Sequence, residues 1–386
     1  MKFIHLSDLH IGKVVNGFSM IQEQQHAFVQ ILDYIKKEKP SAVLIAGDVF
    51  DKAMPTVEAI NVFDDFLTEL SNSGAAVLLI SGNHDSADRL NFGSRLFKDK
   101  NIHLCSIYDS AIKRVTLKDN LGDVNFYLLP FIKPSLFRGL DNSSNIETYD
   151  DAFANALATI KVDYKARNVL MAHQFFIKAD VKLELCEESE RNLVGGLDCI
   201  DITPVEKFDY VALGHLHRAQ KLFSEHIRYC GSPIKYSLSE AAHEKSITLV
   251  ELKEKGNLIV TKLPLVPICD MREIRGKLEE LLNKKVYSKG NRNDYLKVIL
   301  TDEEELLNPM DRVRAVYKNA MVLSFENSKT NIDLSNLSIS SEQYEKLSPL
   351  ELFSEFYLYA YGSAMTSEQA KLMLDLIDGE DYSKSS

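Results

Sequence analysis

The chain has 386 residues, 45% of them hydrophobic, and a formal net charge of −11 at pH 7. This length and apolar content are enough for more than one domain with a sizeable core, and they exclude a globally disordered chain. The negative charge argues against a protein that coats nucleic acid through its own positive field. It does not exclude a nuclease that relies on metal ions, local cations or a partner.

The first two hundred and twenty residues alternate apolar strand-like runs with helical patterns. Helices are expected over 18–39 and 55–73, between strands at 3–6, 42–46 and 76–80, which is the signature of a parallel α/β sheet. A short helix at 87–97, a hairpin with strands at 111–117 and 124–129, and a helix at 150–160 follow. Strands are then expected at 168–172 and 210–213, on either side of a polar surface loop at 178–196.

Four more strand-like runs, 219–223, 227–230, 246–252 and 258–263, predict a second sheet that faces the first. Two prolines, Pro264 and Pro267, mark a domain boundary. The pattern beyond it predicts a helix at 271–282, a strand at 295–300, a helix at 309–317 and a strand at 320–325. Together these elements predict a small α/β module.

The last sixty residues differ in composition from the rest. Residues 326–347 are rich in Ser and Asn and predict a linker. Ser348-Pro349-Leu350-Glu351 forms a capping box that begins one helix, and a second helix begins near Thr366 and ends at Gly379. The predicted divisions are residues 1–267, an α/β domain at 268–328, a linker at 329–347, a helical segment at 348–379 and a disordered tail at 380–386.

The cysteine and hydropathy patterns indicate the compartment. The cysteines are odd in number and show no CxxC spacing: Cys105, Cys186, Cys199, Cys230 and Cys269. We therefore expect free thiols in a reducing cytoplasm. Met1-Lys2-Phe3 begins a strand directly, so no secretory signal is expected, and the sequence has no apolar run of about 18 residues that would cross a membrane.

Polar side chains follow five of the predicted strands, at the point where each strand ends. In open α/β sheets, ligands bind beyond the carboxyl ends of the strands, so these clusters are expected to meet in space. The clusters are Asp8-Leu9-His10, Gly47-Asp48-Val49-Phe50-Asp51, Gly82-Asn83-His84-Asp85, His173 and Gly214-His215-Leu216-His217.

Seven of these side chains offer carboxylate, amide or imidazole groups: Asp8, His10, Asp48, Asn83, His173, His215 and His217. Such a mixture without thiolate suits Mn, Fe or Zn. Seven ligands are too many for one tetrahedral site, but they suffice for two ions if one carboxylate, most naturally Asp48, bridges them. Two ions about 3.5–4 Å apart can activate a water and stabilise both oxygens of a phosphoester displacement.

This set of motifs resembles the calcineurin-like metallophosphoesterases. The N-terminal sequence Ile4-His5-Leu6-Ser7-Asp8-Leu9-His10-Ile11-Gly12 and the partner-type tail make the chain similar, over nearly its whole length, to the nuclease subunits of bacterial nuclease–ATPase complexes. The resemblance implies an α/β fold, the metallophosphoesterase sandwich, in which two mixed β-sheets face each other and are flanked by helices. It also implies a small α/β capping domain at 268–328 and C-terminal helices that bind a partner.

The resemblance also assigns roles to residues. It implies one ion held by Asp8, His10, Asp48 and His217, and a second held by Asp48, Asn83, His173 and His215, with Mn as the metal. A water or hydroxide between the ions would attack phosphorus. His84 would contact the phosphate and stabilise or protonate the leaving oxygen, and Asp85 or a nearby carboxylate would orient His84. Asp51 leaves two interpretations open, a carboxylate that supports the turn, which is favoured, and a contact to DNA.

The implied activity is a Mn-dependent DNA exonuclease and endonuclease that processes DNA ends and hairpins. The implied partner is a coiled-coil ABC-type ATPase that docks on the C-terminal helices, in an assembly of two nuclease and two ATPase subunits. The aromatic residues Phe353, Phe356, Tyr357, Tyr359 and Tyr361 would form the docking stripe.

Two alternatives stay open. A metallophosphatase or cyclic-nucleotide phosphodiesterase that acts on small substrates would carry the same metal motifs. A non-catalytic scaffold is disfavoured because all seven ligands and His84 are present.

Overall fold

The computed structural model describes residues 1–137, 146–178, 199–327, 348–361 and 364–380, and the chain divides into two compact units, Met1–Met271 and Arg272–Ser386. The first unit contains two six-stranded sheets. The first sheet has the order β16-β15-β1-β4-β5-β6. Its strands are β1 (Lys2–Leu6), β4 (Ala42–Ala46), β5 (Ala76–Ile80), β6 (Ile102–Cys105), β15 (Ser246–Leu252) and β16 (Leu258–Pro264).

The second sheet has the order β13-β14-β12-β9-β8-β7. Its strands are β7 (Lys113–Asp119), β8 (Gly122–Leu129), β9 (Arg167–His173), β12 (Tyr210–Gly214), β13 (Gln220–Lys221) and β14 (Ile227–Tyr229). Each sheet has a parallel centre, β1-β4-β5-β6 in one and β8-β9-β12-β14 in the other, with antiparallel strands outside it. The ends of neighbouring parallel strands therefore lie at one edge of each sheet.

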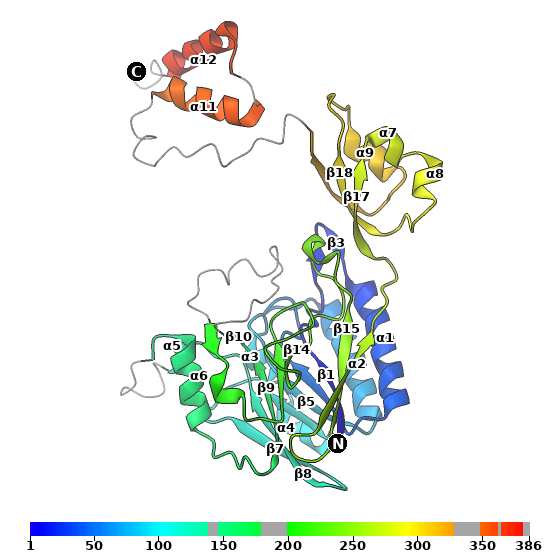
Figure 1. The fold of residues 1–386 in the computed structure, drawn as a ribbon, viewed down its shortest axis with the longest axis vertical. Helices are drawn as coiled ribbons and strands as arrows, with labels where there is room; N and C mark the ends of the chain where they lie inside the picture. The colour runs from blue at the N-terminus through cyan, green and yellow to red at the C-terminus, as the bar shows by residue number, and fades with distance from the viewer. Residues whose placement is uncertain (138–145, 179–198, 328–347, 362–363, 381–386) are drawn as a thin grey trace. The chain divides into compact units, whose positions relative to one another are not determined.

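Three apolar layers hold this unit together, because alternate strand residues face opposite sides of each sheet. Val169 and Met171 of β9 pack with Phe3, Leu44 and Leu78 of the first sheet, in the layer between the sheets. Helices α1 (Ile21–Glu38) and α2 (Val57–Asn72) cover the outer face of the first sheet, and α6 (Tyr149–Ala158) covers that of the second. Figure 1 shows the strands between these helices. The predicted sandwich of two mixed sheets flanked by helices is confirmed.

The first helix begins later than the sequence suggests. Residues 14–19 form a small hairpin, β2 (Val14–Val15) and β3 (Phe18–Ser19), before α1 begins at Ile21. The turn is Asn16-Gly17, and both residues have positive φ, 48° and 87°. This dipeptide is a strong two-residue hairpin signal, and the apolar period of the following helix masked it.

Shorter elements connect the two sheets. The helix expected at 87–97 is two short helices, α3 (Ala87–Leu90) and α4 (Ser94–Phe97), with Gly93 between them at a φ of 74°. A 3-10 turn (Lys98–Lys100), α5 (Pro134–Phe137), and the paired strands β10 (Phe175–Ile177) and β11 (Cys199–Asp201) complete this part, with 3-10 turns at Thr203–Val205 and Leu238–Glu240. The predicted surface loop at 178–196 lies almost wholly outside the described residues.

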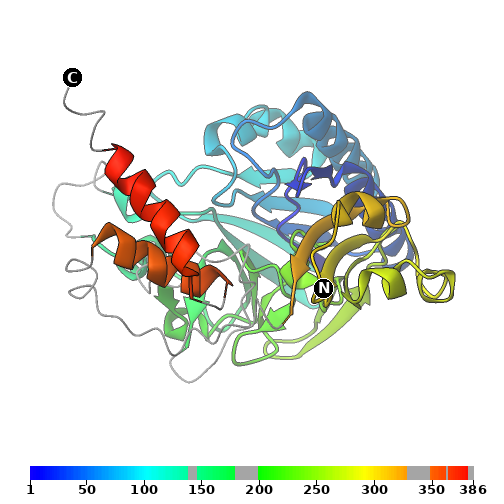
Figure 2. The same cartoon turned by 90° about the horizontal axis from the view of Figure 1, so that it is seen from above.

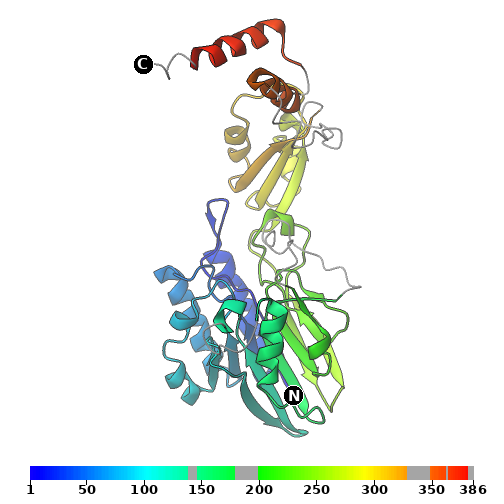
Figure 3. The same cartoon turned by 90° about the vertical axis from the view of Figure 1, so that its left-hand side faces the viewer.

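The second unit is built on a three-stranded sheet, β17-β18-β19. It contains β17 (Met271–Gly276), α7 (Leu278–Leu281), α8 (Lys284–Tyr287), β18 (Tyr295–Leu300), α9 (Pro309–Arg314) and β19 (Ala320–Phe325). Figure 3 shows the three strands side by side. The helix predicted at 271–282 is wrong: its first half is an edge strand paired with β18, and the chain becomes helical only after Gly276. Strand pairing overrides the local pattern here.

Two C-terminal helices follow, α11 (Pro349–Tyr361) and α12 (Ser367–Glu380). The backbone N–H of Glu351 donates to Ser348 Oγ at 3.3 Å, and the backbone N–H of Ser348 donates to Glu351 Oε2 at 2.8 Å, so the expected capping box forms. Figure 2 shows α11 in orange beside α12 in red. Glu380, placed in the tail by the sequence, still belongs to α12. The predicted linker 329–347 and residues 381–386 lie outside the described residues.

No helix in the described part of the chain combines the length and the hydropathy needed to cross a bilayer.

Candidate metal centre

The polar clusters that follow the parallel strands converge at one edge of the sandwich. The seven side chains expected to bind metal come from both sheets: Asp8 and His10 after β1, Asp48 after β4, Asn83 after β5, His173 at the end of β9, and His215 and His217 after β12. Three overlapping groups of residues each offer ligand atoms that lie within 4.8 Å of one another. The groups are Asp8, His10 and His217; His10, Asp48 and His84; and Asp8, Asp48 and His173. Convergence of these strand ends therefore produces a compact polar cluster.

One half of the cluster is centred on His10. Its Nε2 atom lies 3.1 Å from Nε2 of His217 and 3.6 Å from Oδ2 of Asp48. Asp8 Oδ1 accepts the backbone N–H of His215 at 2.9 Å, while Asp8 Oδ2 is buried and has no hydrogen-bond partner among the described residues. Carboxylate and imidazole ligands of the first predicted ion are therefore neighbours.

The other half is centred on Asn83. Its Oδ1 atom lies 3.1 Å from Nε2 of His173 and 3.0 Å from Nδ1 of His215. Nε2 of His173 also lies 3.3 Å from Asp48 Oδ2, the same oxygen that faces His10. Asp48 thus stands between the two halves, where a bridging carboxylate would stand.

The backbone is strained at four of these positions. The φ angles of Asp8, His10, Asp48 and His215 are 53°, 41°, 51° and 101°. Positive φ costs a non-glycine residue about 1–3 kcal/mol and persists where the surrounding structure requires it, which is most often at functional sites. The strand-end turns therefore aim these side chains at the cluster at a cost in stability.

Two glycines leave room for the ligands. Gly47 has a φ of 88°, and a Cβ atom there would overlap the ring of His173. A Cβ atom on Gly82 would overlap the carboxylate and backbone nitrogen of Asp48. Glycine is therefore required at the two turns that bring β4 and β5 to the cluster.

Burial and neighbouring charges set the protonation of the cluster. Burial lowers the pKa of His215 to about 3 and the pKa of His10 well below its ordinary value, so both rings are neutral, the form that ligates metal. Burial opposes charge on His173 too, but the Asp48 carboxylate outweighs it and raises the His173 pKa to about 9. Burial would raise the pKa of Asp48, yet His173 and His10 hold it well below its ordinary range.

The donor set fits a pair of divalent cations. In the part of the chain that the structure describes, Asp8 Oδ2 is a buried acceptor without a partner. The Nε2 atoms of His10 and His217, which face each other at 3.1 Å, compete for one proton. A shared cation satisfies both, and the mixture of carboxylate, amide and imidazole matches Mn, Fe or Zn. The residues present are therefore compatible with two metal ions in this cluster.

His84 lies beside the cluster and is partly exposed. Its ring is 4.8 Å from the ring of His10, and its Nδ1 atom is 2.9 Å from the carbonyl oxygen of Asp51. The prediction was that Asp85 or a nearby carboxylate orients His84, but the His84 Nδ1 atom faces the backbone carbonyl oxygen of Asp51 instead. The Asp51 carboxylate instead pairs with Lys13 Nζ at 2.8 Å.

Asp85 has a different task. Its carboxylate accepts the backbone N–H groups of Val49, Phe50 and Gly82 at 3.1, 3.0 and 2.9 Å. Burial, followed by the nearby Asp48 charge, raises the pKa of Asp85 to about 6 despite these bonds. Asp85 thus ties the turn after β4 to the turn after β5.

Several residues that support the cluster were not predicted. Glu240 Oε1 lies 3.0 Å from Nδ1 of His217, and Lys245 Nζ lies 2.5 Å from Glu240 Oε2. Gln24 of α1 donates to the carbonyl oxygens of Leu9 and His10 at 3.1 and 2.7 Å. Each is a polar residue in an ordinary polar sequence, and no local pattern distinguishes it from a solvent-exposed one.

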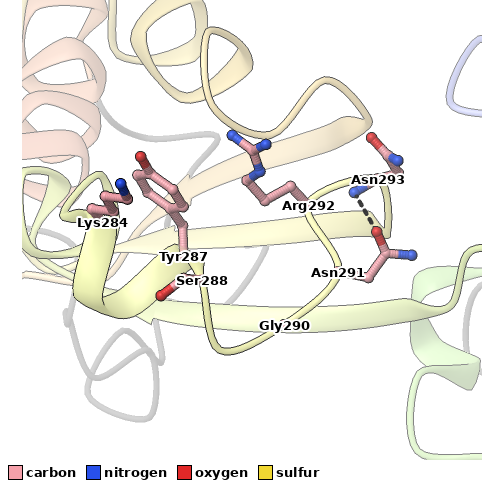
Figure 4. Close-up of a pocket in the computed structure, with 7 residues that line it drawn as sticks. All are labelled: Lys284, Tyr287, Ser288, Gly290, Asn291, Arg292 and Asn293. Atoms are coloured by element: carbon pink, nitrogen blue, oxygen red, sulfur yellow. Dashed lines mark hydrogen bonds between the residues drawn. The ribbon is translucent and has the colours of Figure 1, made fainter.

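A separate hollow of about 620 Å³ lies in the second unit (Figure 4). Its lining is polar and contains no carboxylate or imidazole, so it does not suit a cation. The lining residues are Lys284, Tyr287, Ser288, Gly290, Asn291, Arg292 and Asn293. The Arg292 guanidinium lies 5.3 Å from the centre of the Tyr287 ring. Cations and amides in a stretch without acidic residues are suited to an anionic ligand.

The two facing mixed sheets and the ligand set at their strand ends define a metallophosphoesterase. A family model described as calcineurin-like phosphoesterase matches residues 1–219, and one described as type 5 capsule protein repressor C-terminal domain matches residues 267–360. Among solved structures, a dimetal phosphatase from Danio rerio aligns with 69% of this chain and 97% of its own, at 13% identity and a TM-score of 0.41. This structural similarity is too weak to bear on function.

Two curated relatives match almost end to end. The SbcD subunit of the nuclease SbcCD from Staphylococcus saprophyticus is 30% identical over 376 residues, which are 96% of each chain. The protein of the same name from Staphylococcus epidermidis is 28% identical over 384 residues, 98% of this chain and 99% of that one. The chain belongs to the family of SbcD nuclease subunits, within the calcineurin-like phosphoesterases, and is a metal-dependent phosphodiester hydrolase.

Proposed function

We propose that this chain is a Mn²⁺-dependent DNA exonuclease and endonuclease that hydrolyses phosphodiesters with two metal ions. The observation that supports this proposal most directly is the position of Asp48 Oδ2, 3.6 Å from His10 Nε2 and 3.3 Å from His173 Nε2. Asp8, His10, Asp48 and His217 would hold one ion, and Asp48, Asn83, His173 and His215 the other. Bound there, the ions would supply an activated water and neutralise charge on the phosphate.

The remaining chemistry belongs to the chain itself. His84 would contact the phosphate and deliver a proton to the leaving oxygen. Its Nδ1 faces the carbonyl oxygen of Asp51, which can only accept a hydrogen bond, so Nδ1 keeps its proton. Nε2 is then the atom that would pass a proton to the leaving oxygen. Asp85 serves as a positioning residue for the turns that carry Asp48 and Asn83.

The partner we propose is an SbcC-type coiled-coil ABC ATPase that docks on α11 and α12. Large apolar side chains on these helices are exposed, among them Phe356 at 59%, Leu372 at 64% and Leu376 at 60%. The complete assembly would hold two nuclease and two ATPase subunits. Its role would be the processing of DNA ends and hairpins in repair and recombination, in the cytoplasm.

Hairpin DNA and bis-p-nitrophenyl phosphate, each tested with Mn²⁺, distinguish this proposal from a phosphatase or cyclic-nucleotide phosphodiesterase. We expect cleavage of the hairpin, with the ATPase partner and ATP present. Turnover of the small ester without cleavage of DNA under these conditions would favour a small-substrate enzyme. A charge-preserving change on α11, Phe356→Ser, should reduce co-purification of the partner while leaving turnover of the small ester unchanged.

A further inference from the structure

A buried ion network lies behind His217. Glu240 is fully buried, and its Oε1 atom is 3.0 Å from His217 Nδ1. Its Oε2 atom accepts from Lys245 Nζ at 2.5 Å. Lys245, itself buried, also donates to the carbonyl oxygen of His217 at 2.9 Å and to Ser232 Oγ at 2.8 Å. The network therefore fixes both the ring and the backbone of His217.

The geometry decides which nitrogen of His217 is available. A carboxylate only accepts hydrogen bonds, so the nitrogen that faces Glu240 must carry a proton. The other nitrogen, Nε2, faces His10 Nε2 at 3.1 Å, inside the cluster. In the neutral ring, Nε2 then has a free lone pair, which is what a metal ligand needs.

We propose that Glu240, with Lys245 as its counter-ion, is a positioning residue that presents His217 Nε2 to the first metal ion and strengthens it as a donor. This inference rests on the proposed two-ion function. A hydrogen-bonded carboxylate makes the opposite nitrogen of an imidazole more basic and holds the ring in one orientation, which is worth about 10–100-fold in metal affinity in comparable sites.

Lys245 is what makes this arrangement possible in the interior. An ionised carboxylate without a counter-charge would be strongly disfavoured at a fully buried position. Lys245 Nζ supplies that counter-charge at 2.5 Å from Glu240 Oε2, while Glu240 Oε1 faces His217 Nδ1.

The two halves of the cluster differ in the acceptor that faces the second ring nitrogen of the histidine. His173 Nδ1 lies 2.8 Å from the carbonyl oxygen of Ala46, a neutral acceptor. At His217, the Nδ1 atom lies 3.0 Å from the Glu240 carboxylate. Among the other histidines predicted to bind metal, the described residues give one further contact between Nδ1 and a carboxylate, at 3.9 Å between His10 and Asp51. Loss of Glu240 should therefore weaken one ion and spare the other.

The test is titration of metal-free full-length protein with Mn²⁺. The electron paramagnetic resonance signal measures the concentration of free Mn²⁺ at each step. We expect two sites in the unaltered chain. Glu240→Ala should weaken one site about 10–100-fold and leave the other unchanged. Glu240→Gln keeps an acceptor oxygen but removes the charge, so it should recover part of the lost affinity.

The matched control is Asp209→Asn. Asp209 is also a buried carboxylate, and it pairs with Lys255 Nζ at 2.6 Å and accepts the backbone N–H of Asn168 at 2.7 Å, at the opposite end of β12 from His215. This variant should lose stability but bind both ions normally. Circular dichroism shows which variants are folded, and Glu240→Gln, which is nearly isosteric, provides the measurement if Glu240→Ala does not fold.

Three results would overturn the inference, and they can be told apart. If a folded Glu240→Ala chain binds two Mn²⁺ ions as tightly as the unaltered chain, Glu240 does not position His217; if a folded Glu240→Gln chain does so, the charge of Glu240 does not strengthen His217 as a donor. Either result overturns the inference and leaves the proposed function untouched. If the unaltered chain itself binds no Mn²⁺, the proposed function and the inference fail together.

Discussion

At the scale of single residues, a substitution at His84 tests catalysis separately from metal binding. It contacts the carbonyl oxygen of Asp51 at 2.9 Å and is not needed as a ligand by the proposed scheme. His84→Ser should therefore lower the rate of DNA cleavage by about 10²–10⁴-fold, the contribution of a general acid. Bound Mn²⁺, measured by metal analysis after dialysis, should stay at two ions per chain. Unchanged cleavage would contradict the proposed role.

Lys245 is predicted to matter for stability as well as for the metal site. Replacement by Met leaves the buried Glu240 carboxylate without its counter-charge, and breaking such a pair costs about 3–5 kcal/mol. Lys245→Met should lower the free energy of unfolding in urea by that amount in metal-free protein. The double variant Lys245→Met with Glu240→Leu should recover much of the loss. A loss below about 1 kcal/mol would show that the pair is solvated.

The polar side chains at the strand ends could be predicted from the sequence, but the residues that hold them in place could not. The proposed ligands follow apolar runs that form strands in the structure, so Asp8, Asp48 and His215 could be recognised in the sequence. Glu240 and Gln24 reach the cluster only because a 3-10 turn and α1 pack against it. Their contacts join residues far apart in the chain, and no local period or motif encodes such a contact.

At the scale of elements, the same distinction between local pattern and long-range contact explains which helices and strands were predicted wrongly. Elements whose apolar period agrees with their packing, such as α2 and β15, were predicted to within a few residues. In β17 the apolar positions Met271 and Ile274 are spaced for a helix, but pairing with β18 determines the outcome. The Asn16-Gly17 turn is the opposite case. The local signal was correct and the hairpin forms, but the apolar period of the following helix led the sequence analysis to overlook it.

The second unit carries an element-scale prediction about DNA. Lys284, Lys285, Lys289 and Arg292 fall in one stretch without acidic residues, and Lys284 and Arg292 line the hollow of about 620 Å³. If DNA is the substrate, its phosphates are the anions that suit this surface. Replacing the three lysines by Ala should weaken DNA binding and reduce the slope of log affinity against log salt by up to about 0.9 per lost phosphate contact.

The control variant keeps the positive charge of residues 284–292. Lys284→Arg with Lys285→Arg and Lys289→Arg should bind DNA as the unaltered chain does. Turnover of bis-p-nitrophenyl phosphate should be the same in both variants, because that small ester needs only the metal cluster. An unchanged salt slope in the alanine variant would show that residues 284–292 are not part of the DNA-binding surface.

At the scale of the whole molecule, metal binding should depend on pH. In the metal-free chain the pKa of His173 is about 9, because the carboxylate of Asp48 outweighs the effect of burial. Below pH 9 the ring is protonated, and a cation must displace that proton. Affinity for Mn²⁺ should therefore rise with pH, about tenfold per pH unit for each displaced proton, and level off above pH 9.

Calorimetry can count these protons directly. At pH 7, titration with Mn²⁺ in two buffers of different ionisation enthalpy should give different heats, because released protons are taken up by the buffer. The difference should correspond to at least one proton per chain. Equal heats in the two buffers would show that His173 is already neutral when the ion arrives.

The proposed ligands come from both layers of the sandwich, Asp8, His10, Asp48 and Asn83 from the first sheet and His173, His215 and His217 from the second. Any cation they share would cross-link the two sheets, which are otherwise joined by an apolar layer and by hydrogen bonds such as that from the backbone N–H of His215 to Asp8 Oδ1. An unfolded chain has no such cage, so loading at a hundredfold excess over the dissociation constant adds about 2.7 kcal/mol per ion. Chelation should then lower the melting temperature and open the seam between the layers to proteases, so metal supply would govern how long the enzyme survives as well as how fast it works.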